Sequence, residues 1–301
     1  MIPAVVLNQQ SLSTAAPTTT LQFSHHLALL TSRSDSQRRD SLSHLTSAIA
    51  GRPKDAPLPQ PIAVIFPKLL PLTLDGSNGV RAQLLKLLRS LPPDDTKDQM
   101  EKLSLYIRAG LTHLAADIRT STIELLEWAL EIGGEELVSC PGGWVKTLKT
   151  LLTALAWTDD ATLAGWTSSR AIIGRAGSGD KSLAKALTVL ALFLRAGLEP
   201  PPAADIRSKP NFFPLWHVDA HMIPKKSNPY GYLNLFGPPR DEESQGYEDR
   251  EERQIVFAKI FQDRVGKGAA AARKEGGEIG RAGAAVVKAL EEGMKDAQSN
   301  I

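Results

Sequence analysis

The segment GRAGSGDKS at residues 174–182 comes closest, in this sequence, to a phosphate-binding loop. That loop needs a glycine, four further residues and then Gly-Lys-Ser or Gly-Lys-Thr, so that backbone N–H groups and the lysine surround the phosphates. Here Asp180 separates Gly179 from Lys181, which breaks the spacing and adds a carboxylate that opposes phosphate. No strand pattern precedes the segment. We therefore interpret it as a loop between helices, with Asp180 as the N-cap of the next helix.

A second candidate for chemistry is HVDAH, which places His217 and His221 four residues apart. That spacing can hold zinc on one helix face. However, no glutamate follows the first histidine, no third ligand is near, and prolines flank the segment. Cys140 is the single cysteine, so the chain can form neither an internal disulfide nor a paired-thiol metal site. We expect no catalytic residue, no metal site and no cofactor, and hence a protein that is not an enzyme.

Composition sets the limits for the fold that must position any site. The 301 residues are 42% hydrophobic, which is enough for a sizeable core in one long domain or two ordinary ones. The net charge is only +2, which argues against a generally polybasic protein. No run of about 18 apolar residues is present, so no membrane span is expected. A single thiol fits a reducing compartment, either the cytosol or the nucleus.

Apolar periodicity predicts helices almost throughout residues 20–198. We expect them at 21–30, 36–50, 79–91, 96–109, 117–132, 143–157, 160–173 and 181–196, and again at 250–265 and 278–297. Asp35 is the expected cap of the second helix, and Gly133-Gly134 are expected to end the fifth. In the apolar stretch 61–76, Pro67 and Pro71 should bend a helix rather than abolish it. Strand patterns are almost absent and the loops are short, which favours antiparallel helix pairs.

Two of the loops repeat one pattern: an aspartate, an aliphatic-arginine pair and a leucine-rich helix. The residues are Asp75, Val80 and Arg81 in the first loop, and Asp117, Ile118 and Arg119 in the second. Together with Arg39, the helix-start arginines recur at intervals of about 40 residues, which is the period of HEAT and armadillo repeats. We interpret these residues as structural groups that bridge successive repeat loops. Direct contact with a partner is the alternative.

The character of the sequence changes after Gly197. Residues 199–240 hold nine of the twenty prolines, together with six aromatic residues: Phe212, Phe213, Trp216, Tyr230, Tyr232 and Phe236. Dense proline prevents regular helix, whereas disordered segments are poor in aromatic residues. We infer an extended segment whose rings dock onto the repeats of the same chain or onto a partner. The sequence thus predicts a flexible arm at 1–19, a repeat domain at 20–198, an extended docking segment at 199–249 and C-terminal helices at 250–301.

Basic residues of the later repeats form another candidate surface. They are Lys146 and Lys149, which share a helix face, followed by Arg170, Arg175, Lys181 and Lys185. If they gather on one edge, they could contact an RNA backbone or an acidic partner. An ordinary solvated face is the alternative, because no aromatic RNA-reading motif accompanies them. The charge run at 241–253 is also expected to be solvated.

Several long blocks resemble one known family. They include VVLNQQSLS, SRSDSQRRDSLSHLTS, YIRAGLTHLAADIRTSTIELLEWAL, EELVSCPGGWVKTLK and YGYLNLFGPPRDEE. These blocks resemble the fungal pre-rRNA-processing Ipi family, the helical-repeat subunit of the Rix complex, whose animal relative is the testis-expressed ten protein. Members of this family usually begin with a lysine-rich arm, whereas this sequence starts almost at the first block.

The resemblance implies a non-enzymatic role in nuclear maturation of the large (60S) ribosomal subunit, linked to removal of the second internal transcribed spacer. It also implies partners: a larger helical Rix scaffold subunit, a WD-repeat Ipi subunit, the pre-60S particle and a midasin-type AAA ATPase. Some members are linked to replication licensing. The rival hypotheses are a generic repeat adaptor in nuclear transport or chromatin, and an enzyme that binds nucleotide at 174–182.

Overall fold

The computed structural model describes residues 18–53, 57–157, 179–200 and 241–297. Over these ranges the chain forms helices joined by turns, and no strand occurs in them. The prediction of an all-α fold is confirmed. The chain divides into two compact units, residues 1–96 and 97–301. The arm expected at 1–19 falls outside the described residues apart from its last two positions, and so does the segment 201–240.

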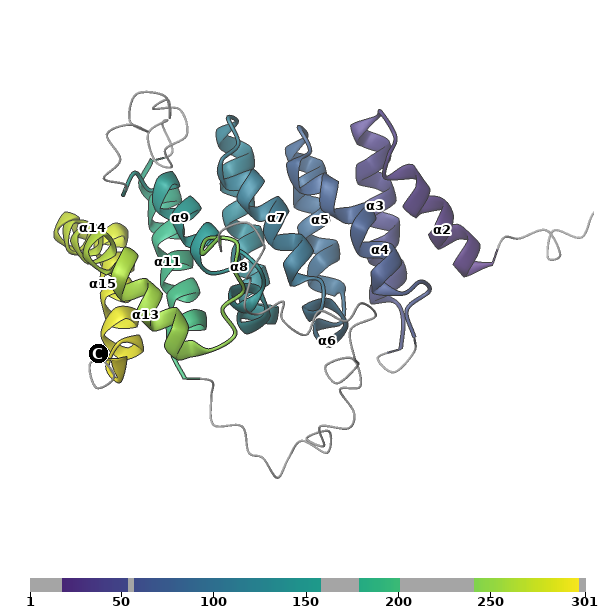
Figure 1. The fold of residues 1–301 in the computed structure, drawn as a ribbon. Coiled ribbons are helices and arrows are strands. Elements are labelled where there is room, and N and C mark those ends of the chain that lie inside the picture. Colours follow the sequence, from purple (N-terminus) through teal and green to yellow (C-terminus); the bar gives the residue numbers. More distant parts are fainter. Residues whose placement is uncertain (1–17, 54–56, 158–178, 201–240, 298–301) are drawn as a thin grey trace, which may run out of the picture. The chain divides into compact units, whose positions relative to one another are not determined.

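The first unit is built from helix pairs that stack through their second helices. It contains α2 (Thr19–Leu29), α3 (Asp35–Ala50), α4 (Ile62–Leu69), the 3-10 helix η1 (Leu70–Leu74) and α5 (Asn78–Ser90). Helix α2 packs on α3, and α3 packs on α5 (Figure 1). The core of this unit is mostly aliphatic, with Leu42, Ile65 and Leu87 fully buried, and it includes the buried ring of Phe66. Helix pairs that stack on one another through their second helices are typical of HEAT and armadillo repeats.

Two local predictions in the first unit need correction. Helix α3 is capped by Ser34, whose hydroxyl accepts a hydrogen bond from the N–H of Gln37 at 3.4 Å, and Asp35 is the first helical residue. The aspartate therefore acts on the helix dipole instead of capping it. In the apolar stretch, α4 tolerates Pro67, but at Pro71 the chain tightens into a 3-10 helix, because proline cannot supply the next N–H.

The second unit repeats the same arrangement and adds C-terminal helices. The short α6 (Pro93–Lys97) lies at the boundary of the two units. The unit then contains α7 (Met100–Leu111), α8 (Ala116–Ser139), α9 (Val145–Ala154), α11 (Gly179–Leu198), α13 (Arg250–Ile260), α14 (Gln262–Glu275) and α15 (Gly277–Gly293). Helix α7 pairs with α8, α8 packs on α11, and α11 packs on α15 (Figure 1). Helices α14 and α15 form a hairpin whose turn is Gly276-Gly277, both with positive φ.

Helix α8 is longer than the sequence indicated. It continues to Ser139, with a kink at Gly133, whose φ of −147° and ψ of 56° are not helical. A Cβ at Gly134 would lie 3.1 Å from the Cβ of Ala196, so a glycine there lets α8 approach α11 closely. The helical backbone that begins at Ala116 is therefore interrupted at Gly133, where the sequence placed its end, and a second helical segment continues to Ser139.

An aromatic cluster forms the core of the second unit. The ring of Trp144 is fully buried and stacks on Phe193, with the centroids 5.3 Å apart. Phe257 of α13 lies 6.3 Å from the same tryptophan, so the C-terminal helices share this core. Gly197 is essential to the packing, because a Cβ there would come within 2.2 Å of the tryptophan ring. No helix over the described ranges is long and apolar enough to cross a bilayer.

Acid should destabilise the first unit, because a histidine stack joins α2 to α3. The rings of His26 and His44 stack with centroids 4.4 Å apart. Burial lowers the pKa of His26 below its usual value of 6.5, and the neighbouring His44 and His25 lower it further. Between the folded and the unfolded pKa, the unfolded chain binds more protons. The stability that the uncharged His26 contributes is therefore fully present above pH 6.5, the pKa of an unfolded histidine. It is lost as the pH falls through the lower pKa of His26 in the folded chain.

Urea unfolding of the first unit, followed between pH 7.5 and 5, measures this effect. We expect His26→Phe, which keeps a ring but cannot be protonated, to flatten the pH dependence. His25→Gln, a change at an exposed position, should retain most of the pH dependence of the wild type. A wild-type free energy of unfolding that does not change over this range would refute the prediction.

Candidate interaction surface

An arginine occupies the fourth position of four helices, and in each its side chain curls back onto the preceding loop. These residues are Arg38 in α3, Arg81 in α5, Arg119 in α8 and Arg253 in α13. The backbone N–H of each arginine donates to the carbonyl four residues earlier, that of Ser34, Ser77, Ala115 and Asp249, at 3.1–3.3 Å. The guanidinium Nη1 then donates to a carbonyl six residues earlier, and in three of the four also to the carbonyl five residues earlier. These bonds give loop carbonyls a donor, in surroundings that range from exposed at Arg33 to buried at Tyr247.

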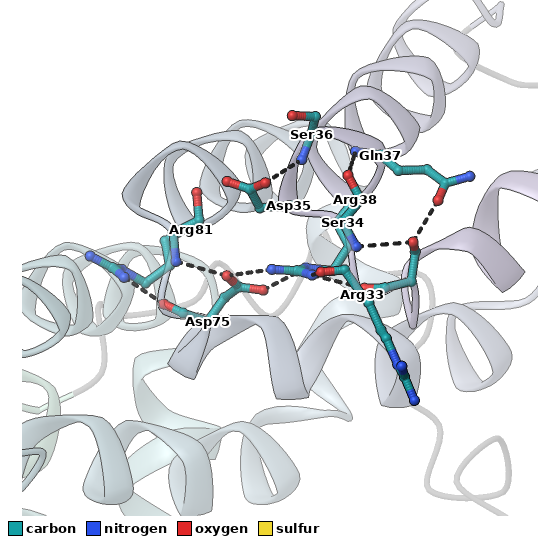
Figure 2. Close-up of polar contacts among 10 residues, drawn as sticks. Arg33, Ser34, Asp35, Ser36, Gln37, Arg38, Asp75 and Arg81 are labelled. Carbon is teal, nitrogen blue, oxygen red and sulfur yellow. Dashed lines mark hydrogen bonds and ion pairs between the residues drawn. The ribbon is translucent and has the colours of Figure 1, made fainter.

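Asp75 connects the first two of these arginines (Figure 2). Its carboxylate accepts from Nε and Nη2 of Arg38 at 2.8 and 3.0 Å, and from the N–H of Ser77 at 2.8 Å. Its backbone carbonyl accepts from Nη1 of Arg81. The two paired side chains are 7% exposed for Asp75 and 16% for Arg38. A two-pronged, largely buried ion pair of this kind fixes the loop before α5 against the start of α3.

The arginine that begins the repeat series is Arg38, whereas the sequence analysis used Arg39. Arg39 is 56% exposed and lies 3.6 Å from the carboxylate of its neighbour Asp40. One residue along a helix rotates a side chain by about 100°, which turns Arg39 toward solvent. The repeat period alone does not reveal which of two adjacent arginines faces the loop.

Asp75 and Asp117 are not equivalent, although the sequence paired them. Asp117 lies within α8, at an exposed position two residues before Arg119. The residue six before Arg119 is His113, whose Nδ1 accepts from the N–H of Ala115 at 3.0 Å, as Asp75 does from its own loop. Burial lowers the pKa of Arg119, and the charge of Asp117 opposes this shift. Val80 and Ile118, the aliphatic partners of the pairs, are both buried in the cores of their units.

Arg253 was missed by the sequence analysis, yet its guanidinium donates at least five hydrogen bonds. It is 2% exposed, and its Nε donates to the carbonyl of Gly197 at 2.9 Å. Its Nη1 donates to the hydroxyl of Ser139 at 3.0 Å, and its Nη2 to Glu135 at 2.9 Å. It therefore joins the ends of α8 and α11 to the start of α13. The signal in the sequence was an arginine four residues after Asp249, an aspartate at the N-cap position of α13.

Lys146 and Lys149, two of the lysines expected to contact a partner, lie on α9 and are paired within the chain. We call residues 241–249 the acidic loop. Lys146 contacts the hydroxyl of Ser244, with its Nζ 3.7 Å from a carboxylate oxygen of Asp241. Lys149 pairs with Glu243 at 3.0 Å. A hydrogen bond from Ser244 holds the pKa of Asp241 below its usual range, and Lys146 contributes in the same direction. Any acidic partner at these lysines would therefore compete with the acidic loop.

The charged side chains of the acidic loop are exposed, as the sequence indicated, but the loop also packs against the rest of the second unit. Tyr247 is 4% exposed, and its hydroxyl donates to the carbonyl of Glu242 at 2.8 Å. The N–H of Gly142 donates to the carbonyl of Gln245 at 3.1 Å, which ties the loop to the turn after α8. The charged tips remain exposed, so only the aromatic and backbone groups are buried. A buried tyrosine within a charged run decides this outcome.

The remaining predicted residues are distributed as follows. Lys181 lies in the first turn of α11, beside Lys185 and opposite Arg281 of α15, around a shallow hollow of about 440 Å³. Lys185 is paired with Glu127 of α8. Asp180 lies in the first turn of α11, which begins at Gly179. The other residues proposed for partner binding lie outside the described residues: Arg170, Arg175, Phe212, Phe213, Trp216, Tyr230, Tyr232 and Phe236. The same holds for His217 and His221.

Cys140 has the environment of an unreactive thiol. Its Sγ lies 3.8 Å from the hydroxyl of Ser104 and 3.1 Å from the carbonyl of Leu137. Burial raises its pKa, and the smaller contributions of Ser104 and Arg108 oppose that shift. A raised pKa means little thiolate at neutral pH. Across the described ranges, no three or more His, Cys, Asp or Glu residues come together as metal ligands would.

Comparisons with known proteins place this chain in a family. The Pre-rRNA-processing protein ipi1 of Aspergillus fumigatus is 49% identical to it, over 96% of this chain and 86% of that protein. The protein of the same name from Sclerotinia sclerotiorum is 49% identical over 97% of this chain and 86% of that protein. The chain belongs to the Ipi1 family. The resemblance found in the sequence blocks is thereby confirmed.

The Ipi1 relationship is supported by a family model. The model Ipi1_N, described as a Rix1 complex component involved in 60S ribosome maturation, matches residues 94–194. The match covers α7, α8, α9 and most of α11, and so includes Arg119. A chain of a solved Rix1-Rea1 pre-60S particle aligns with 65% of this chain and 72% of its own length, at 19% identity and a TM-score of 0.47. The family assignment rests on the relatives that match nearly the whole chain.

Proposed function

We propose that this chain is a non-enzymatic scaffold subunit of the Rix complex in maturation of the 60S ribosomal subunit. The observation that carries the proposal is its identity of 49% to pre-rRNA-processing ipi1 proteins over 96–97% of its length. Stacked helix pairs also suit this role, because each pair buries its core against its neighbours and leaves long surfaces for partners.

The proposed partners are a larger helical Rix scaffold subunit and a WD-repeat Ipi subunit, with the pre-60S particle as the assembly on which they act. A midasin-type AAA ATPase is a further partner of the assembled complex. The proposed location is the nucleus, where large-subunit precursors mature. The step that depends on the complex is removal of the second internal transcribed spacer from pre-rRNA. In a scaffold, carboxylates of a partner would compete with the acidic loop for Lys146 and Lys149 of α9.

The test is affinity purification of the tagged chain from nuclear extract, with mass spectrometry and probing for the spacer. We expect the two Rix-complex subunits and spacer-containing large-subunit precursors to co-purify. In parallel, depletion of the chain should raise the amount of spacer-containing pre-rRNA. Recovery of transport factors or chromatin instead, with normal spacer processing after depletion, would support a generic adaptor and overturn the proposal.

A further inference from the structure

The C-terminal hairpin carries a long groove that none of the contacts described above uses. The groove has a volume of about 1090 Å³ and lies between α14 and α15. Its apolar lining consists of Gly266 and Ala270 from α14, Val287 and Leu290 from α15, and Met294 directly after α15. All five are at least partly exposed, although apolar side chains of a helix hairpin normally pack against a neighbour. The spacing of four residues on α14, and of three and four on α15, makes each set one stripe along its helix.

Gly266 shows that the groove is open and not filled by the chain itself. A Cβ built on Gly266 would have no atom within 4 Å. Two residues later, a Cβ at Gly268 would lie 2.3 Å from the ring of Trp157, so that glycine is required for packing. A glycine inside a helix makes that helix less stable than alanine would, which is a cost in stability. At Gly268 the close approach of the tryptophan explains this cost, and at Gly266 the described part of the chain offers no such reason.

The shape of the groove fits a helix. On α14 it runs from Gln262 to Lys274, a length of about 18 Å at 1.5 Å per residue, which matches about three helical turns. Its walls are two antiparallel helices, and a third helix laid between them would complete a packed layer. An amphipathic helix in such a groove is a common mode of recognition, with contacts at i, i+3, i+4 and i+7.

The charges around the groove identify the kind of helix. The charged residues that line it are Lys267, Arg273, Lys274 and Lys295, against Asp263 and Glu291. Lys267 and Asp263 form an ion pair at 2.6 Å. The remaining charged residues of the rim are Arg273, Lys274 and Lys295 against Glu291, which is an excess of positive charge. A helix with carboxylates beside its apolar stripe would complement this rim.

We propose that the α14–α15 groove binds an acidic amphipathic helix of a partner protein. A second copy of this chain is a poor occupant, because its own hairpin would bring the same cationic rim and the two would repel. The acidic run of this chain is also a poor occupant, because its loop at 241–249 is already held by Lys146 and Lys149. The inference goes beyond the proposed scaffold function and does not depend on it.

The test uses the purified full-length chain and two labelled peptides, each long enough for about four helical turns. Both peptides carry leucines at helical spacing, and one has glutamates and the other lysines beside the stripe. Fluorescence anisotropy should show the glutamate peptide binding at least tenfold more tightly than the lysine peptide. Gly266→Trp, which fills the groove, should weaken binding of the glutamate peptide at least tenfold. Gly266→Ala, the matched control, should bind within about twofold of the wild type and melt no lower.

A second variant tests the proposal even if Gly266→Trp does not fold. Arg273→Glu combined with Lys274→Glu changes two exposed rim residues and should remove the preference for the glutamate peptide. Equal binding of both peptides, no measurable binding, or tight binding that neither variant changes would overturn the proposal. Dimerisation of the wild type in sedimentation experiments, abolished by Gly266→Trp, would also overturn it in favour of a second copy. None of these outcomes depends on spacer processing, so they stand apart from the test of the proposed function.

Discussion

Replacing Arg253 with alanine is expected to lower the free energy of unfolding of the C-terminal helices by about 3–5 kcal/mol. The arginine is 2% exposed, and its loss would leave the buried carbonyls of Gly197 and Tyr247 without their donors. Each such group costs about 1–3 kcal/mol. Glu135 contributes little to the loss, because it is 53% exposed and can be hydrated when the arginine is gone. The large effect therefore comes from the orphaned carbonyls and the cavity, and only to a small extent from the ion pair.

Hydrogen exchange followed by mass spectrometry measures this effect on the intact chain. Amides of α13–α15 that exchange through opening of this region should exchange about 100-fold faster or more in Arg253→Ala. Lys259→Ala, at an exposed position of the same helix, should leave exchange within a few-fold of the wild type. Arg253→Lys should fall between the two, because lysine keeps the charge but lacks the planar fork of donors. If Arg253→Ala exchanged like Lys259→Ala, the proposed anchoring role would be wrong.

The second large effect is expected at Asp75. Asp75→Ala should destabilise the first unit by about 2–4 kcal/mol, because it leaves Nε and Nη2 of Arg38 and the N–H of Ser77 without an acceptor. Arg38→Ala should cost a similar amount, since it leaves a carboxylate that is only 7% exposed. Asp75→Asn keeps an oxygen for the N–H of Ser77 and should cost less. Denaturant unfolding of the single variants measures these values.

A double-mutant cycle separates the ion pair from the other contacts of the two residues. The coupling energy between Asp75→Ala and Arg38→Ala should be on the order of 1–3 kcal/mol, as for residues in one buried network. Arg39→Ala is the control, because this neighbouring arginine is 56% exposed and should cost less than about 0.5 kcal/mol. Additive losses at Asp75 and Arg38 would mean that the pair does not hold the two loops together.

The arginine loops mark the limit of what the sequence predicted about the site. The repeat period correctly directed attention to Arg81 and Arg119, both of which are 4% exposed. It did not distinguish Arg38 from Arg39, and it missed Arg253, whose helix follows a long segment without the repeat. It also gave Asp117 the place that His113 occupies. A shared sequence pattern identifies a helix start, but the direction of a side chain depends on the residue's exact phase on the helix.

The sequence alone determined the all-α class, the family and the approximate bounds of most helices. The expected single helix at 250–265 was wrong, because the chain breaks at Phe261 into α13 (Arg250–Ile260) and α14 (Gln262–Glu275). Helix periodicity, proline and glycine act over a few residues, which is why the expected 79–91 and 181–196 lie close to α5 (Asn78–Ser90) and α11 (Gly179–Leu198). The tertiary structure decided how separate segments meet. Only the docked helices bring Arg253 to Gly197, 56 residues away, and the acidic loop to Lys146 and Lys149, which are far from it in the sequence. Such contacts depend on how buried faces pack, and local sequence patterns carry no record of the partner across the interface.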